Sequence, residues 1–212
     1  MHPLTPYTII SYMIKKELDY HYIEGSYGGN QEWFAGPMMK LGGCGAETAC
    51  ESSIYFTVHK GLGLYPFDIN NMTREDYKKF GAIMKPYLSP RMTGIDRLEI
   101  FIDGFGAYLK DRGEPRITMT EFSGTEPFDS AKEIIMAQID KGFPIPMLML
   151  NHKNKKYKDY DWHWFIVNGY KYDSKAFYIK AVTYSEFEWI DLAEFWDTGY
   201  ERKGGLVLFD MK

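Results

Sequence analysis

The sequence predicts an α+β fold with two lobes, a helical one followed by an antiparallel sheet. Segments whose apolar residues recur at helical spacing dominate roughly the first 140 residues, and short strand-like runs fill roughly the last 70. Because helices and strands follow one another in blocks instead of alternating, we expect antiparallel pairing and not a parallel α/β sheet. The chain has 212 residues, which fits a single domain, and no internal repeat or low-complexity segment is visible.

The predicted helices carry start or stop signals of their own. The first follows a glycine turn, has helix formers early and apolar residues later, and stops at Gly61. A variant capping box, Thr73 to Asp76, opens the second helix, and Pro86 ends it. In the third, apolar residues recur every three or four positions, and Gly113 ends it. We expect helices at 46–60, 75–85, 96–111 and 131–141, with a helical turn at 191–196.

The predicted strands are short apolar or alternating runs between turn residues. The run IPMLMLN is one example, and KAFYIKAVT, reached through the turn Tyr172-Asp173-Ser174, is another. We expect strands at 116–122, 145–151, 163–170, 175–183 and 205–209, with short ones at 20–23 and 188–190. Most of them lie in the last third of the chain, where they would form the sheet.

The composition argues against several kinds of partner. The formal net charge is −4, and the single basic run, 153–158, is followed at once by Asp159 and Asp161, so no nucleic acid is expected as a partner. No apolar stretch is long enough to span a membrane, and the first residues do not resemble a signal peptide. The five histidines are scattered without short ligand spacing, so we expect no metal and no other cofactor.

Cys44 lies between a glycine turn and the first predicted helix, in the run LGGCGAETA. At a helix N-terminus, free N–H groups and the positive end of the helix dipole favour a thiolate. The flanking Gly43 and Gly45 would let the backbone turn sharply and let a substrate carbonyl come close. The alternative is a small buried apolar residue, which is the role we expect for Cys50, too far along the same helix for a disulfide. Such sparse cysteine usage fits a reducing compartment, so we expect the protein in the cytoplasm.

His163 opens the predicted strand HWFIVNGY, 119 positions after Cys44. A cysteine and a histidine that are distant in sequence and adjacent in the fold form the usual nucleophile and base of a thiol hydrolase. The alternative is a packed histidine between two tryptophans. Both residues together, each with suitable flanks, favour a catalytic pair.

A helix-bound Cys followed by a His on a later strand resembles the papain-like cysteine peptidases. The details are most similar to the bacteriocin-leader (double-glycine) peptidase branch and its stand-alone bacterial forms. That branch typically has a Gln, then Cys-Gly-Ala opening a helix, and later a His followed by an apolar strand ending in Gly-Tyr. Here these elements are Gln31, the run 44–46 and the run 163–170, so the resemblance covers about 30–51 and 144–184.

The resemblance implies a papain-like two-lobe fold over 1–212, with a helical lobe at about 30–142 packed on a sheet lobe at about 143–212. It implies that Gln31 donates to the oxyanion, although Gln31 also fits a plain loop residue. The family has Asp or Asn on the strand after the His, where this chain has Ala181, Val182 and Thr183. Thr183 or a backbone carbonyl would then orient the imidazole; Asp161 and Asp173 are substitutes that the sequence does not place.

We therefore expect a cysteine peptidase that acts on a peptide or protein through an acyl-enzyme on Cys44, with His163 as general base. Two alternatives stay open. Since the usual third residue is missing, the chain could be a papain-like binding module with weak or no turnover. The same Cys and His could also serve an acyltransferase in which an amine replaces water. The sequence leaves substrate preference and oligomeric state open.

Overall fold

A computed structural model gives the structure of the protein and describes residues 13–91 and 94–212. Its centre is an antiparallel sheet of seven strands among the described residues. Six lie in the order β4-β9-β5-β6-β7-β8, and β1 pairs with the second half of β6. Their bounds are β1 Ile14–Glu17, β4 Ile117–Ser123, β5 Ile145–Met149, β6 His163–Tyr172, β7 Phe177–Thr183, β8 Glu186–Asp191 and β9 Gly205–Met211. A separate hairpin pairs β2 (Tyr22–Ile23) with β3 (Ser26–Tyr27).

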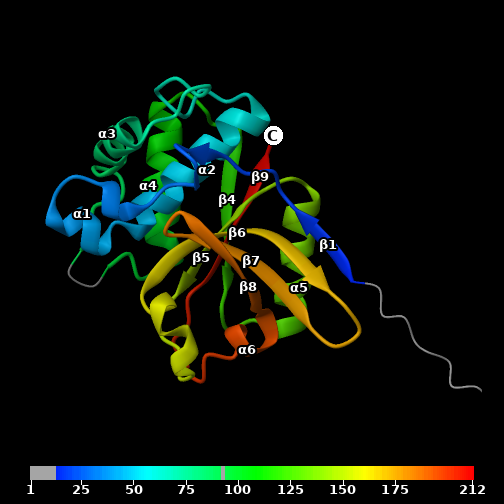
Figure 1. Cartoon of the computed structure of the whole chain (residues 1–212). Helices are drawn as coiled ribbons and strands as arrows, with labels where there is room; N and C mark the ends of the chain where they lie inside the picture. The colour runs from blue at the N-terminus through cyan, green and yellow to red at the C-terminus, as the bar shows by residue number, and fades with distance from the viewer. Residues whose placement is uncertain (1–12, 92–93) are drawn as a thin grey trace, which may run out of the picture.

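Helices cover both faces of the sheet (Figure 1). One layer holds α1 (Pro37–Gly42), α2 (Cys44–Lys60), α3 (Arg74–Met84) and α4 (Leu98–Asp111), and the other holds α5 (Phe128–Asp140) and α6 (Leu192–Trp196). Short 3₁₀ helices lie at Gln31–Trp33 (η1) and Lys155–Tyr160 (η2).

Alternation along the strands divides the core into two apolar clusters. On β6, Trp164 belongs to the cluster under α2 and α4, whereas its neighbour Phe165 belongs to the cluster under α5 and α6. Successive side chains of a strand point to opposite faces, so β6 is buried on both sides. This double burial explains why the sequence has four apolar residues in succession at 164–167 instead of alternating apolar and polar residues.

The predicted mixture of helices and antiparallel strands is confirmed. The four long helices lie where expected, with ends shifted by a few residues. Two strands from the first 142 residues, β1 and β4, belong to the large sheet, so the sheet extends beyond the region 143–212 that we assigned to it. β1 was not predicted, because its four residues are all exposed and carry no apolar alternation; its pairing with β6 makes it a strand.

A buried polar cluster anchors the N-terminal segment on the middle of α2. The Glu51 carboxylate accepts hydrogen bonds from the Gly29 N–H (3.0 Å) and the Tyr20 hydroxyl (2.8 Å), and the His21 Nε2 lies 3.1 Å from it. Burial alone would raise the pKa of Glu51, but the His21 ring and these donors outweigh burial and lower it. These contacts tie the middle of α2, the helix that begins at Cys44, to residues 20–29.

Substitution of His21 by Ala should lower the free energy of unfolding by about 3 kcal/mol, because it removes the ring nitrogen that lies 3.1 Å from the buried Glu51 carboxylate. Urea denaturation measures this. The matched control is Glu24→Ala, which removes a surface ion pair with Arg74 and should cost about 0.5 kcal/mol or less. Equal losses in the two variants would show that the Glu51 cluster does not anchor the segment.

Candidate active site

Cys44 is the first residue of α2, as the sequence predicts. Two glycines make this position possible. A Cβ on Gly43 would lie 2.2 Å from the Met39 carbonyl oxygen, and one on Gly45 would lie 2.8 Å from the Ile95 side chain. Only glycine therefore lets α1 run directly into α2 with Cys44 at the junction.

The Cys44 thiol is buried and meets β6 at its main chain. Burial raises the pKa of Cys44 to about 11, against the N–H groups of Trp164, Gly45 and Cys44 itself, which favour the thiolate. Our expectation of a lowered thiol pKa is wrong for this structure, because desolvation exceeds the effect of the helix N-terminus. Trp164 directly follows His163, so the sulfur lies beside the start of the strand that carries His163.

His163 is the first residue of β6 and is 3% exposed. Its Nε2 lies 2.7 Å from the Thr183 hydroxyl oxygen at the end of β7. Burial lowers the pKa of His163 to about 4, so the ring is neutral at pH 7. The Thr183 contact is the one that the resemblance implied, and its role in catalysis stays a prediction.

Tyr184, which the sequence analysis did not single out, stacks on His163. The two rings are nearly parallel, with centroids 4.9 Å apart and an angle of 3°. Tyr184 and Ser185 form the two-residue turn between β7 and β8, and both have positive φ, 51° and 65°. Such a turn favours Asn-Gly, and a bulky residue there costs roughly 1–2 kcal/mol. The strain marks Tyr184 as a candidate functional residue.

Gln31 lies in η1 and is buried. Its Nε2 donates to the Lys40 carbonyl (2.9 Å), which leaves one of its two N–H bonds free, and its Oε1 has no partner. Its main-chain N–H faces the carboxyl of Glu47, one turn along α2 from Cys44. Gln31 thus lies beside the first turn of α2, where the resemblance would place an oxyanion donor.

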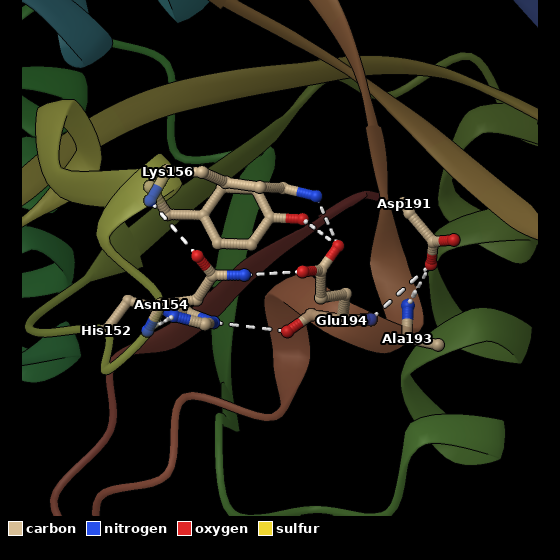
Figure 2. Close-up of polar contacts among 7 residues, drawn as sticks. His152, Asn154, Lys156, Asp191, Ala193 and Glu194 are labelled. Atoms are coloured by element: carbon tan, nitrogen blue, oxygen red, sulfur yellow. Dashed lines mark hydrogen bonds and ion pairs between the residues drawn. The ribbon is translucent and has the colours of Figure 1, made fainter.

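The loop that leads into His163 is fixed by Glu194 of α6 (Figure 2). The Glu194 carboxylate accepts from Asn154 Nδ2, Tyr157 Oη and Lys156 Nζ, all of the loop before β6. The Glu194 carbonyl lies 3.1 Å from His152 Nε2, and Asp191 caps the N-terminus of α6 by accepting from the Ala193 N–H. This network ties η2 to α6 and so holds the approach to β6.

Some of the predicted site residues are hydrogen-bonded to each other, and others only lie close to one another. His163 and Thr183 are hydrogen-bonded; Cys44 and Gln31 lie at the first turn of α2. Between the Cys44 thiol and the His163 ring, both within the described part of the chain, no hydrogen bond is formed, so their direct contact stays a prediction. Asp161 accepts from the His152 N–H, and Asp173 closes the turn before β7, so neither takes the place of Thr183.

A pocket of about 310 Å³ lies beside the base. Thr183 and Tyr184 line it together with Tyr160 and Phe187, and three acidic side chains, Asp159, Glu186 and Glu188, complete its wall. The pocket is therefore open to solvent next to the residues that hold His163, although the imidazole itself is buried.

No protein-family model matches this chain, and no curated protein matches it in sequence. Among the described residues, no group of three or more His, Cys, Asp or Glu side chains could hold a metal ion. The helices described here include none that is long and apolar enough to cross a membrane.

Cys44 should react slowly with iodoacetamide at pH 7, and its rate should rise about tenfold per pH unit up to about pH 11, because only the thiolate reacts. Cys50 is fully buried and should react more slowly throughout. Mass mapping of labelled peptides over a pH series measures both rates, with Cys44→Ala as the control. Fast labelling of Cys44 at pH 6–7 would instead support the thiolate that the helix N-terminus alone predicts.

His163 should make the protein less stable in mild acid. The unfolded state takes up a proton near pH 6.5 and the folded state only near pH 4, so stability is complete above pH 6.5 and falls between these values. The part of this loss that comes from His163 is about 3 kcal/mol. The difference in unfolding free energy between pH 7 and pH 4 should therefore be smaller by this amount in His163→Asn. His59→Asn, at an exposed site, should change that difference less. An unchanged slope in His163→Asn would mean that His163 titrates normally.

Proposed function

We propose that this protein is a cysteine hydrolase, most simply a peptidase, with Cys44 as nucleophile and His163 as general base. The observation that carries the proposal is the position of Cys44 at the start of α2, against the main chain of β6 next to His163, whose ring Thr183 orients. A nucleophile, a base and a residue that orients the base are the parts that acyl transfer requires.

The resting pair is neutral in this proposal, because burial favours both the thiol and the imidazole. We assign the tautomer in which Thr183 accepts from His163 Nε2–H, and this tautomer leaves Nδ1 as the proton acceptor. As the sulfur attacks the substrate carbonyl, its proton passes to Nδ1, and the imidazolium then gives it to the leaving amine. Water, deprotonated by His163, attacks the thioester and releases the acid.

The oxyanion that forms during attack needs donors near Cys44. The main-chain N–H of Cys44 lies at the helix start, where it points toward the sulfur, and the second Nε2–H of Gln31 is not used by Lys40. Both belong to preorganised parts of the fold, so they need little rearrangement to stabilise the developing charge.

A hydroxyl in place of a carboxylate should lower the efficiency of the base without abolishing it. Thr183 orients the ring but does not stabilise the imidazolium as an anion would. A site that lacks this stabilisation is compatible with a slow peptidase, with an acyltransferase or with a binding module, and turnover distinguishes the three.

His163→Ala should abolish hydrolysis of a broad peptide library, whereas Thr183→Ala should lower kcat/KM about tenfold or less, because only ring orientation is lost. Thr120→Ala, an exposed threonine on β4, is the matched control and should not change the rate. Liquid chromatography with mass detection of the products measures the rates. Equal activity of His163→Ala and wild type would exclude His163 as the base; transfer of the acyl group to added amines in preference to water would identify an acyltransferase.

A further inference from the structure

Two glutamates lie one turn apart on the same side of α2, and they have opposite surroundings. Glu51 has the Gly29 N–H, the Tyr20 hydroxyl and His21 around it, and its pKa is lowered. Glu47 has one main-chain N–H, that of Gln31, and its pKa is raised well above the ordinary range by burial and by the nearby carboxylates of Glu51 and Glu32. When the surroundings shift the pKa values of two neighbouring carboxyl groups in opposite directions, they favour an anion at one group and a neutral acid at the other.

The atoms left without partners point to the same conclusion. Glu47 and Gln31 are 3% and 5% exposed, and the Oε2 of Glu47 and the Oε1 of Gln31 are both buried with no partner. Both atoms are acceptors if Glu47 is ionised, and leaving two buried acceptors unsatisfied costs several kcal/mol by order of magnitude. A proton on Glu47 turns one of these acceptors into a donor, and the Gln31 main-chain N–H, which faces the Glu47 carboxyl, places the two residues next to each other.

We propose that Glu47 is a positioning residue: as a carboxylic acid it donates from Oε2 to the Gln31 side-chain carbonyl and fixes the Gln31 amide beside Cys44. The Gln31 amide is then held at two points, by Glu47 at Oε1 and by the Lys40 carbonyl at one N–H. The remaining N–H is the one free to donate. Glu47 itself touches no reacting atom.

This inference rests on the proposed function only for the use of that last N–H. The position of the amide is a property of the resting protein and can be measured without a substrate. The variant Glu47→Gln keeps a donor of similar shape, since a carboxamide N–H can replace the acid O–H, whereas Glu47→Leu fills the same space without a donor.

The test is the Gln31 side-chain amide resonance in ¹⁵N-labelled protein, assigned by its loss in Gln31→Ala. We expect slow hydrogen exchange of this amide in the wild type and in Glu47→Gln, and exchange at least tenfold faster in Glu47→Leu. Glu32→Gln, at an exposed neighbour on η1, is the matched control and should exchange as the wild type does. Unchanged protection in Glu47→Leu would overturn the proposal.

Infrared spectroscopy tests the protonation state separately. A protonated carboxyl C=O band should be present at pH 7 in the wild type and in Glu32→Gln and absent in Glu47→Gln; a wild type without the band would overturn the proposal. On peptides, Glu47→Leu should lower kcat about tenfold or more with KM little changed, and Glu47→Gln should restore it. If neither the wild type nor any variant hydrolyses a peptide, but the exchange data show that Glu47 fixes the Gln31 amide, the proposed function fails and the inference on Glu47 stands.

Discussion

The packing of the first turn of α2 against the start of β6 is the contact on which the candidate site depends. It brings the Cys44 thiol to the main chain beside His163 and places Glu47 next to Gln31. Glycines at 43 and 45 allow the chain to pack closely around Cys44, because a Cβ at position 43 would collide with Met39 of α1 and a Cβ at position 45 with Ile95. Two polar networks hold the elements that form this contact. The Glu51 cluster ties α2 to the N-terminal segment, and the Glu194 network ties the loop before β6 to α6 (Figure 2).

Burial dominates the electrostatics at this contact. Cys44, His163 and Glu47 all have pKa values shifted by burial in the direction that favours their neutral forms. Glu51 is the exception, because it alone has enough donors to remain an anion. Burial of a neutral thiol slows its oxidation and alkylation, and in the proposed mechanism proton transfer accompanies attack instead of preceding it.

The parts of the site that lie in short local patterns could be predicted from the sequence. Cys44 and His163 are marked by the residues directly around them, and Thr183 follows from a register count between neighbouring strands. Glu47 and Tyr184 could not be found this way, since a glutamate in a helix and a tyrosine in a turn have no local mark of burial or stacking. The positive φ of Tyr184 was also hidden, because the sequence Tyr-Ser does not resemble the residues that favour such a turn.

The same distinction explains the error on the Cys44 pKa. The helix N-terminus is visible in the sequence and favours a thiolate, but the desolvation that outweighs it arises from packing against β6, which the sequence does not display. The fold class was predictable because it depends on the order of elements, whereas β1 was not, because the main-chain hydrogen bonds that make it a strand come from β6, far along the chain.

Histidine ring ¹⁵N resonances, measured before and after Cys44 is alkylated at high pH and returned to pH 7, test most directly whether Cys44 and His163 form a pair. If they do, His163 carries its proton on Nε2 toward Thr183, and alkylation shifts its Nδ1 signal while leaving that of His152, which belongs to the Glu194 network, unchanged. A His163 ring protonated on Nδ1, or one whose signals ignore the modification of Cys44, would contradict the pairing and with it the proposed chemistry.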